Sequence, residues 1–399
     1  MKKLTLIFIC LFCCFDIFSQ KITTIRMDPN YARGGSASEI FNKIEFIPLQ
    51  SGGESTFDRI DQIGFSDDNI VILDRTYYNI LIFKKNGTFH AKIKGRDSIK
   101  LITSFTIDDQ RKEIIFRGDN AGTLYFYNFD GKRLRTQKMS SDQVASLYYF
   151  GDKLMLANIE RPNKFAKNKD TTLYDLHYVR DFNFKVPVQK LLPYNPKFAP
   201  FEFNGGIPIY ASDDNTCFFA MPYDYNIYHL GAKGIINQYK FLFPAENSLP
   251  VNFATDSAYT KKRVQYALDP KNNKKFIKID NIFKVADNLT FITKYEGIFT
   301  ADRFYSYNLK SGNLLSFGRV NGDKTSYLME LVHPERNSQI IGVHQGDLYA
   351  SVPAMMLLSY ADNKELKKMQ ISPELEEFFQ KGSRLDNPVL IRLRLKEGL

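Results

Sequence analysis

Residues that could perform chemistry are few and scattered along this chain of 399 residues. Its five histidines are His90, His177, His229, His333 and His344. No two of them stand four residues apart, the spacing that places two metal ligands on one face of a helix. The chain contains no Gly-x-Ser-x-Gly elbow, phosphate-binding loop or paired-cysteine zinc motif. The sequence therefore predicts no catalytic residue, no metal and no cofactor.

The four cysteines add little reactivity. Cys10, Cys13 and Cys14 lie in an N-terminal apolar segment, and Cys217 lies in the apolar run TCFFAM. A lone cysteine in such a run is typical of a buried strand thiol rather than of a nucleophile. Once the N-terminal segment is removed, no disulfide can form within the chain.

Residues 1–20 have the pattern of a signal peptide. Two lysines precede an apolar run, 4–15, which is too short to span a bilayer because spanning takes about 20 apolar residues. Ser19 offers a small residue at a cleavage point. The mature chain, 21–399, is therefore expected in the periplasm, outside the cell or at the outer membrane. The letters LFCC resemble a lipoprotein box with Cys14 as the lipid-bearing residue, but fit it poorly, so free export is favoured over a lipid anchor.

The composition favours a packed, soluble chain with a basic surface. Hydrophobic residues make up 44%, charged residues 25%, and the formal net charge is +10. These values exclude global disorder. The basic residues are scattered, and export argues against a nucleic acid partner. The absence of Trp weakens any proposal of a sugar-stacking platform.

One block of strands and turns recurs along the chain. The clearest copy, 58–93, contains three apolar strands after its first run and closes its last hairpin with Asn86-Gly87, which suits a turn with positive φ. A second copy places strands at 113–117 and 123–128, and it uses Asp130-Gly131 at the same turn. The copies are about 40 residues apart, the length of a propeller blade.

The repeat predicts an all-β fold, a single six-bladed β-propeller of four-stranded antiparallel blades, as a monomer. Apolar spacing near 3.6 after Pro353 and Pro373 predicts two short helices near the C-terminus. An N-terminal strand at 44–49 is expected to complete the last blade and close the ring. The expected blades are 57–95, 101–138, 143–192, 205–242, 280–318, and 338–399 together with 43–50.

The mature chain resembles the six-bladed propeller proteins exported by Bacteroidetes, which are similar in shape to NHL-repeat propellers. The resemblance is carried by KIEFIPLQ, NIVILDRTYYNILIFKKNGTFHAKI, FDGK and DNPVLIRLRLK. Relatives often follow the first blade with a Gly-Pro-Gly-Glu loop, whereas this chain has Lys94-Gly95-Arg96-Asp97-Ser98. A role attached to that loop therefore does not transfer. The resemblance implies the fold, and since the family mostly lacks an assigned activity, it implies no reaction.

In such a propeller, links from second to third strand and from blade to blade lie on one face. The long connections 159–170, 190–205, 243–278 and 319–337 all fall on that face, and loops on a rigid scaffold are where recognition is usually built. We therefore expect the binding site there, near the channel mouth. His344 is expected to face the channel as a polar side chain. The candidate ligand-binding residues are Arg75, Tyr77, Tyr78, Asp119, Asn120, Glu160, Arg161, Tyr223, Tyr225, Tyr295, Glu296 and His344.

Three functions are compatible with these features. The leading hypothesis is a non-enzymatic binding or scaffold protein that contacts a peptide, glycan or protein partner at the cell envelope. The alternative is a propeller hydrolase or lyase with its site at the channel mouth, and a third is a structural subunit of an outer-membrane assembly. Three or more convergent carboxylate, His or Arg groups in the axial pocket would favour the enzyme, whereas a broad aromatic surface would favour binding.

Overall fold

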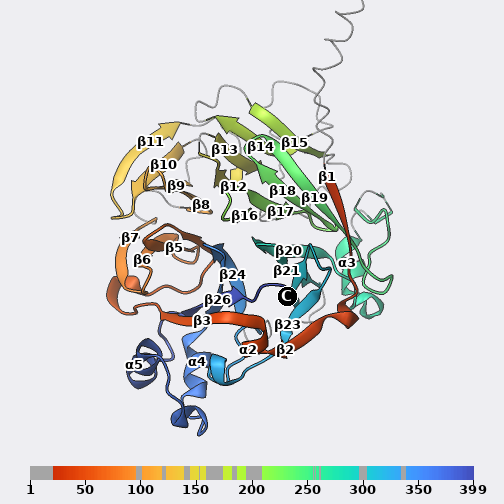
Figure 1. The fold of residues 1–399 in the computed structure, drawn as a ribbon. Coiled ribbons are helices and arrows are strands. Elements are labelled where there is room, and N and C mark those ends of the chain that lie inside the picture. The colour runs from red at the N-terminus through yellow and green to blue at the C-terminus, as the bar shows by residue number, and fades with distance from the viewer. Residues whose placement is uncertain are drawn as a thin grey trace, which may run out of the picture.

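The computed structural model describes residues 21–95, 101–118, 123–138, 144–151, 153–158, 174–181, 187–194, 209–254, 256, 258–259, 262–295, 303–333 and 338–399. Within these residues the strands form six sheets of four or five strands each. Figure 1 shows the sheets arranged around a common centre. The expectation of an all-β propeller with four-stranded antiparallel blades and few helices is confirmed.

Three sheets follow the order of the chain, with each strand antiparallel to the next. Their strands are β4 (Gln62–Phe65), β5 (Asn69–Asp74), β6 (Asn79–Lys84) and β7 (Phe89–Ile93); β8 (Phe105–Asp108), β9 (Glu113–Arg117), β10 (Thr123–Asn128) and β11 (Arg133–Lys138); and β12 (Val144–Tyr149), β13 (Lys153–Asn158), β14 (Tyr174–Asp181) and β15 (Pro187–Tyr194).

The other three sheets each take one strand from the N-terminal segment. Their strands are β16 (Tyr210–Ala211), β17 (Cys217–Ala220), β18 (Asn226–Gly231) and β19 (Gly234–Leu242) with β1 (Lys21–Arg26); β20 (Lys278–Val285), β21 (Asn288–Lys294), β22 (Arg303–Asn308) and β23 (Leu314–Asn321) with β2 (Arg33–Ser36); and β24 (Gln339–His344), β25 (Asp347–Val352) and β26 (Val389–Leu395) with β3 (Phe41–Pro48).

The structure describes five blades with their side chains, whereas six were expected from the sequence. The sheet of β12, β13, β14 and β15 is described by its backbone pairing, and most of its side chains lie outside the described residues. The expected six blades are therefore corrected to five blades that the structure describes with their side chains.

The strands of the first blade follow directly from the sequence pattern. β5 reads NIVILD and is buried throughout, and the four central residues of NILIFK in β6 are buried as well. β-branched and aromatic residues favour such strands. The turn to β7 requires Gly87, which has a φ of +86° and no room for a Cβ, because that atom would lie 2.1 Å from the carbonyl oxygen of Pro48. This turn therefore packs against the end of β3.

The N-terminal strap, defined here as residues 21–56, passes along the outer edges of successive sheets. β1 adds parallel to β19, β2 adds parallel to β23, and β3 pairs antiparallel with β26. Figure 1 shows these three strands on the outside of the ring. The pairing of the 44–49 segment within the last sheet was expected and is confirmed. The parallel strands β1 and β2 were not expected, because four-stranded sheets were predicted to be complete.

The described helices are short and lie in connections. They are α2 (Ala37–Ile40), α3 (Arg263–Leu268), α4 (Ala354–Tyr360) and α5 (Pro373–Lys381), with 3-10 helices η1 (Pro29–Tyr31), η2 (Gly53–Ser55), η3 (Pro270–Asn272), η4 (Lys324–Ser326) and η6 (Leu366–Lys368). α4 and α5 confirm the two helices expected near the C-terminus. Pro373 is the first residue of α5, where its missing N–H costs nothing. Among the residues described, no helix has the length and apolar character needed to cross a membrane.

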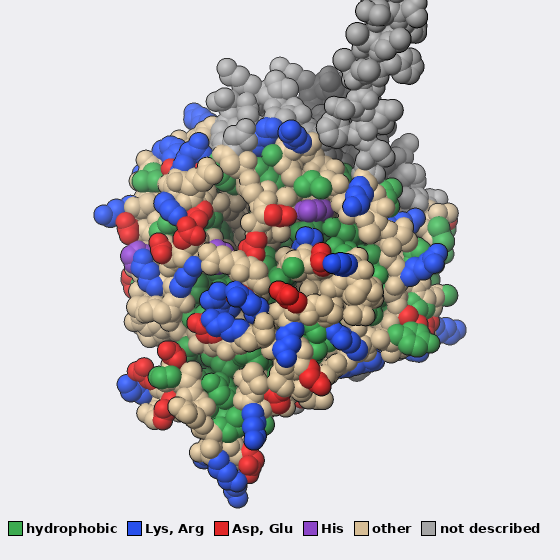
Figure 2. All heavy atoms as spheres, in the orientation of Figure 1, with side chains coloured by type: hydrophobic (Ala, Val, Ile, Leu, Met, Phe, Trp, Pro, Cys, Tyr) green, Lys and Arg blue, Asp and Glu red, His purple; other side chains and the backbone are tan. Residues whose placement is uncertain are grey.

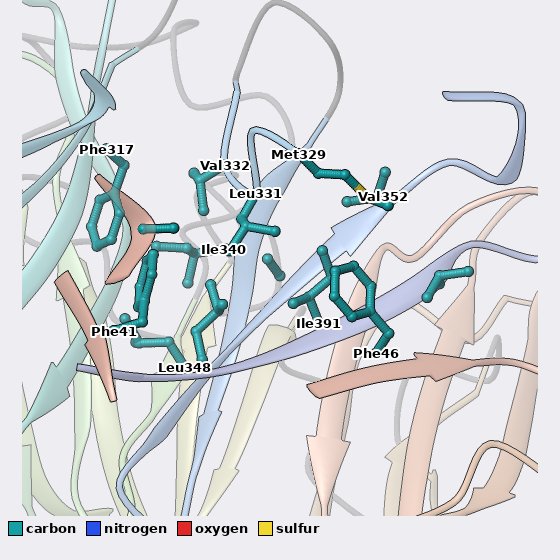
Figure 3. Packing of buried hydrophobic residues seen from close by; sticks show 14 of the residues in the cluster. Phe41, Phe46, Phe317, Met329, Leu331, Val332, Ile340, Leu348, Val352 and Ile391 are labelled. Atoms are coloured by element: carbon teal, nitrogen blue, oxygen red, sulfur yellow. The ribbon is translucent and has the colours of Figure 1, made fainter. Parts of the chain in front are cut away.

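The hydrophobic core lies between neighbouring sheets, and the strap contributes directly to it. Figure 3 shows one such cluster, in which Phe41 lies beside Phe317 and Phe46 lies beside Ile391. The rings of Phe41 and Phe317 stack with their centroids 6.3 Å apart. Since a fully buried Phe side chain stabilises a fold by about 1.5–3 kcal/mol, β3 is a structural part of the last blade.

A buried polar pair recurs at the start of the second strand of several sheets. The Nζ of Lys84 in β6 donates to Asn69 of β5 at 3.2 Å, and Asn308 of β22 donates to Asn288 of β21 at 3.2 Å. In β25 the carboxylate of Asp347 is fully buried and accepts from Arg392 and Arg394, the latter at 2.6 and 2.9 Å. These pairs satisfy polar groups that the hairpin would otherwise bury unpaired.

Candidate functional site

Strand alternation gives the ring two different faces. Links between the second and third strands and between sheets lie on one face, called here the link face. Turns between the first and second strands lie on the other, called the hairpin face. Two long described insertions, 243–277 and 353–388, both belong to the link face because they join β19 to β20 and β25 to β26.

The 243–277 insertion is held to its sheet by the hydroxyl of Tyr225. This hydroxyl donates to the carbonyl oxygen of Phe276 at 2.7 Å and accepts from the N–H of Leu249 at 2.8 Å. Burial raises the pKa of Tyr225 well above its usual value, so the hydroxyl keeps its proton. One side chain therefore joins both ends of the insertion to the link between β17 and β18.

Arg263 forms the centre of the same insertion. Its side chain is 1% exposed, and its guanidinium donates to the carbonyl oxygens of Phe253 at 3.0 Å and Ala254 at 2.8 Å. The guanidinium also lies over the ring of Tyr223, 5.8 Å from its centroid. Because the charge is enclosed by carbonyl oxygens and an aromatic ring, the insertion is folded around it.

Aromatic side chains complete the attachment. Phe276 packs edge-on against both Phe243 and Tyr295, with ring centroids 4.8 and 5.1 Å apart. Tyr223 packs edge-on against Phe253 at 5.4 Å. Three of the predicted site residues, Tyr223, Tyr225 and Tyr295, are thus brought together, and what they contact is the base of the insertion.

The second insertion, 353–388, is attached beside β3. Leu375 and Phe378 of α5 are buried in the same cluster as Phe46. Asn387, which is 1% exposed, accepts from the N–H of Phe57 at 3.1 Å and donates to two carbonyl oxygens of the strap at 2.8 and 2.9 Å. Figure 1 shows α3 and the α4–α5 pair at different places on the periphery, so the two insertions flank the ring.

Large apolar side chains that remain exposed are concentrated in or beside the link-face connections. Val251 is fully exposed and Leu385 is 89% exposed. Others on this face are Tyr77, Leu101, Leu242, Leu268 and Met355. Figure 2 shows one face of the molecule, on which apolar groups lie between charged side chains of both signs. Where exposed apolar groups form a contiguous patch, they mark an interaction site.

A buried polar cluster, called here the Asp280 cluster, lies on neighbouring sheets at the link-face end of the inner strands. Asp280 is 7% exposed, accepts from Lys278 at 3.0 Å, lies 3.5 Å from Lys294 and also accepts from the hydroxyl of Tyr210. Burial would raise the pKa of Asp280, but the two lysines hold it below its usual value. The same burial, reinforced by the carboxylate, raises the pKa of Tyr210 well above its usual range.

The Asp280 cluster contains one carboxylate whose charge is fully compensated. Among the described residues, no group of three or more His, Cys, Asp or Glu side chains could hold a metal ion. A β-bulge follows Asp280, where the register with β21 shifts before Phe283. Such bulges re-aim side chains at functional sites. In this arrangement the Tyr210 hydroxyl keeps its proton and donates it in a hydrogen bond to Asp280, and both lysines pair with the same carboxylate.

His344 lies at the other end of its inner strand, beside the hairpin face. Its ring stacks on Phe65 with centroids 5.3 Å apart, and burial lowers the pKa of His344. In the adjoining turn the carboxylate of Asp213 accepts from the N–H groups of Gln345 at 2.9 Å and Gly346 at 2.8 Å. His344 is therefore separated from the link-face tyrosines by the length of the strand.

A small surface pocket of about 210 Å³ lies on one face of the β8–β11 sheet. Arg135 covers Phe126, with its guanidinium 3.9 Å from the ring centroid, and pairs with both carboxylate oxygens of Glu113. Arg111 pairs with Asp108 at 2.9 Å. The pocket therefore has an apolar floor and a rim on which each carboxylate has a cationic partner.

The remaining predicted site residues lie either in the link between β5 and β6 or outside the described residues. Arg75 and Tyr77 are exposed in the link between β5 and β6, and Tyr78 has a φ of 55° there. The N–H of Arg75 donates to Asp61 at 2.7 Å, so this link is a turn closed by the carboxylate. The other predictions lie outside the described residues: Asp119, Asn120, Glu160, Arg161 and Glu296.

The Asp280 cluster and Arg263 were not anticipated. Arg263 stands in a run of basic residues, Lys261-Lys262-Arg263, that is typical of solvated surface. Its only distinguishing signal is the helical spacing of apolar residues that follows it. Asp280 is preceded by Ile279 and followed by Asn281, which gives no sign that two lysines would converge on it.

A comparison with protein families matches residues 22–394 to a family described as a domain of unknown function, DUF4934. The chain belongs to this family. The expected membership of a propeller family is thereby supported, and neither this match nor the structural likenesses identify an NHL repeat. A comparison with curated proteins finds no match.

One solved structure supports the fold of this DUF4934 chain, and two others were compared with it. A protein described as exported, from Bacteroides fragilis NCTC 9343, is 17% identical with a TM-score of 0.68, covering 94% of this chain and 100% of that one. A member of the DUF4221 family from Bacteroides vulgatus is 12% identical, with a TM-score of 0.45 and coverage of 90% and 99%. BamB from Moraxella catarrhalis is 14% identical, with a TM-score of 0.38 and coverage of 77% and 75%. The first likeness shows a shared fold alone, and the other two carry no argument.

Proposed function

We propose that this protein is an exported, non-enzymatic binding or scaffold propeller that contacts a partner protein through its link face, chiefly through the 243–277 insertion. Export is supported by the signal-like pattern of residues 1–20 and by the exported relative from Bacteroides fragilis. A rigid scaffold that presents loops is the usual design of a recognition protein.

The observation that carries the proposal is the contrast between the base and the tip of the insertion. Its base is fixed by the Tyr225 hydroxyl and the buried Arg263, so little conformational entropy is lost on binding. Its outer surface exposes Val251 completely and Leu268 to 49%. An apolar side chain that is held out from a rigid loop gains free energy when a partner covers it.

Charges on the insertion define the partner further. Exposed lysines occur on the same insertion as these apolar side chains, and Lys274 is 70% exposed although it pairs with Glu246 at 3.0 Å. Lys262 and Lys271 are exposed as well. A complementary partner surface is therefore apolar at its centre and acidic at its rim. A protein surface meets both requirements, whereas a glycan would be expected to stack on Trp, which this chain lacks.

Site-specific photo-crosslinking tests the proposal. A crosslinking amino acid is placed at Val251 or at Leu268 of the full chain in its native cells, with Ile236 as the control because it is 48% exposed on the outer strand β19. We expect one protein to be captured from both insertion positions and not from Ile236. The double substitution Val251→Asp and Leu268→Asp should then weaken binding of that protein at least ten-fold, as expected for central apolar contacts.

Three results decide against the proposal. Equal capture from all three positions would show non-specific contact, and failure of the double variant to weaken binding would place the contact elsewhere. Capture of a species whose mass is removed by glycosidases, or only of short peptides, would replace the protein partner with a glycan or a peptide. The purified chain is also screened against a ligand array with and without divalent metals.

The competing proposal is a hydrolase or lyase that acts at the channel mouth. It is supported by the Asp280 cluster, where Tyr210 and two lysines meet a carboxylate on inner strands. If that proposal holds, Tyr210→Phe abolishes turnover of a substrate found in the array and leaves the fold intact. If the binding proposal holds, the variant binds the crosslinked partner as well as the natural chain does.

A further inference from the structure

The N-terminal strap covers the outer strands of successive sheets as it passes around the ring. It covers β19 with β1 and β23 with β2, and it supplies the outer strand β3 of the last sheet. It then reaches β7, where the side chain of Gln50 accepts from the N–H of Phe89 at 2.9 Å and the carbonyl oxygen of Glu54 accepts from Lys92 at 3.0 Å. The strap ends there because the chain enters β4.

The next outer strand in this series is β11, and none of the described residues pairs with its outer edge. Five of its six residues are exposed, including Leu134 at 49%. An outer strand has N–H and C=O groups that point away from the sheet and can pair with an added strand. This molecule already uses such edges twice, for β1 and for β2, so an extended segment fits this kind of edge.

The charge of β11 identifies the segment that would fit. The strand reads RLRTQK and follows Lys132, so four basic side chains and no acidic ones lie between 132 and 138. A second copy of the chain would bring the same charges against each other, which disfavours edge-to-edge pairing of two copies. An acidic extended segment has the complementary charge.

The pocket described above lies beside this edge. Arg135 and Gln137 line it from β11, and Ile115 and Phe126 form its apolar part. Because alternate side chains of a strand point to the same face, every second residue of an added strand would pass this pocket. Its volume of about 210 Å³ suits one large uncharged side chain, since both carboxylates on its rim are already paired. Main-chain bonding combined with a side-chain pocket is the usual mode of strand addition.

We propose that the outer edge of β11 is a second binding site, which takes up an extended acidic segment of a partner protein as an additional strand, with one side chain of that segment in the adjoining pocket. This site is separate from the link-face insertion, and the partner at either site can be lost without affecting the other.

The test uses the mature chain and a fluorescent peptide of about ten residues, the upper length of an ordinary strand, in which Glu alternates with Val. Two control peptides replace every Glu by Lys or alternate residues by Pro, which cannot donate a main-chain bond. Binding is measured by fluorescence anisotropy. The double variant Arg133→Glu and Lys138→Glu should weaken binding at least ten-fold. The matched control, Lys367→Glu and Lys368→Glu, changes two side chains on η6 that are 61% and 68% exposed and should leave binding unchanged.

Hydrogen exchange provides a measurement that does not depend on any variant folding. Saturation of the natural chain with the acidic peptide should slow exchange in peptides that cover 133–138 and leave the 243–277 insertion unchanged. The proposal is overturned if exchange at 133–138 is unaffected, if the Lys or Pro peptide binds as tightly as the acidic one, or if the η6 control weakens binding equally. Because the crosslinking experiment uses other positions, its outcome stays independent of this one.

Discussion

Removal of the Tyr225 hydroxyl should loosen the 243–277 insertion without unfolding the propeller. The substitution Tyr225→Phe keeps the ring and its edge-on contact with Phe243, at a centroid distance of 5.0 Å. It removes the group that accepts from Leu249 and donates to Phe276. The insertion therefore loses two bonds that hold its two ends, and the strands of the sheet lose none.

The expected change in the free energy of opening the insertion follows from the two backbone groups that lose their partner, the N–H of Leu249 and the carbonyl oxygen of Phe276. A buried donor or acceptor without a partner costs about 1–3 kcal/mol, and Leu249 and Phe276 are 7% and 0% exposed. Two such groups give about 2–6 kcal/mol for opening of the insertion. That change corresponds to exchange of its amide protons that is about 30-fold to about 20,000-fold faster, because about 1.4 kcal/mol is a factor of ten.

Hydrogen exchange with mass spectrometry measures this directly in peptides that cover 243–277. Peptides from β5 and β6 report the global stability and should be unchanged. Tyr31→Phe is the matched control, because Tyr31 is 84% exposed. If exchange in the insertion rises by less than about three-fold in Tyr225→Phe, the hydroxyl does not hold the insertion, and the reasoning that makes it a rigid binding element is wrong.

Three further perturbations test the fold. Burial lowers the pKa of His229 from 6.5 to about 4, so the unfolded chain binds the proton first as the pH falls. The stabilisation is fully present above pH 6.5 and decreases by about 3 kcal/mol by pH 4. His229→Phe should remove this decrease in the free energy of unfolding, measured by urea titration at each pH. Asp347→Asn leaves two arginines facing a neutral amide and should cost about 2–3 kcal/mol in urea unfolding, less than a fully buried pair because both arginines are partly exposed. Gly87→Ala combines a φ of +86° with a Cβ 2.1 Å from a carbonyl oxygen and should lower stability by about 1–3 kcal/mol in the same assay.

Matched controls separate these effects from general sensitivity. Asp362, whose side chain is 97% exposed, is the control for Asp347, and its change to Asn should alter stability by less than about 0.5 kcal/mol. Gly346 has a φ of +76° but nothing within 4 Å of an added Cβ, so Gly346→Ala isolates the backbone cost from the clash. A stability–pH curve of His229→Phe with the same slope as the natural chain would show that another group titrates in this range.

Local pattern predicted the strands well where sequence neighbours also become sheet neighbours. The segments 113–117 and 123–128 were placed with the bounds that β9 and β10 have. Their apolar residues and the Asp130-Gly131 turn specify a hairpin without help from the rest of the chain. The pairing of β3 with β26 could be inferred as well, because an incomplete last repeat and an unpartnered early strand fit each other.

The parallel strands of the strap could not be predicted in the same way. β2 reads RGGS, which has no strand propensity, and it pairs with Asn321 and its neighbours only because the edge of β23 is free at that point. β1 pairs with residues more than 200 positions away. Such pairing is decided by which edges remain open once the sheets have formed.

The roles of the candidate site residues also depend on tertiary contacts that the sequence does not reveal. Tyr223, Tyr225 and Tyr295 were chosen because tyrosines in links often bind ligands, and the structure gives them the role of fixing the insertion. Arg263 looked like solvated surface in sequence, and its burial depends on carbonyl oxygens that only the folded insertion supplies.

By itself the sequence determined the repeat, because strand propensity, alternation and turn chemistry act over a few residues. It also predicted that the 243–278 connection is long and lies on the link face, whereas the expected connection 159–170 and most of 190–205 lie outside the described residues. Only the tertiary structure decided which edges the strap covers, which charges meet in the Asp280 cluster and that no described strand pairs with the outer edge of β11. These depend on contacts between segments far apart in the chain, and their free energy arises only when the ring brings those segments together.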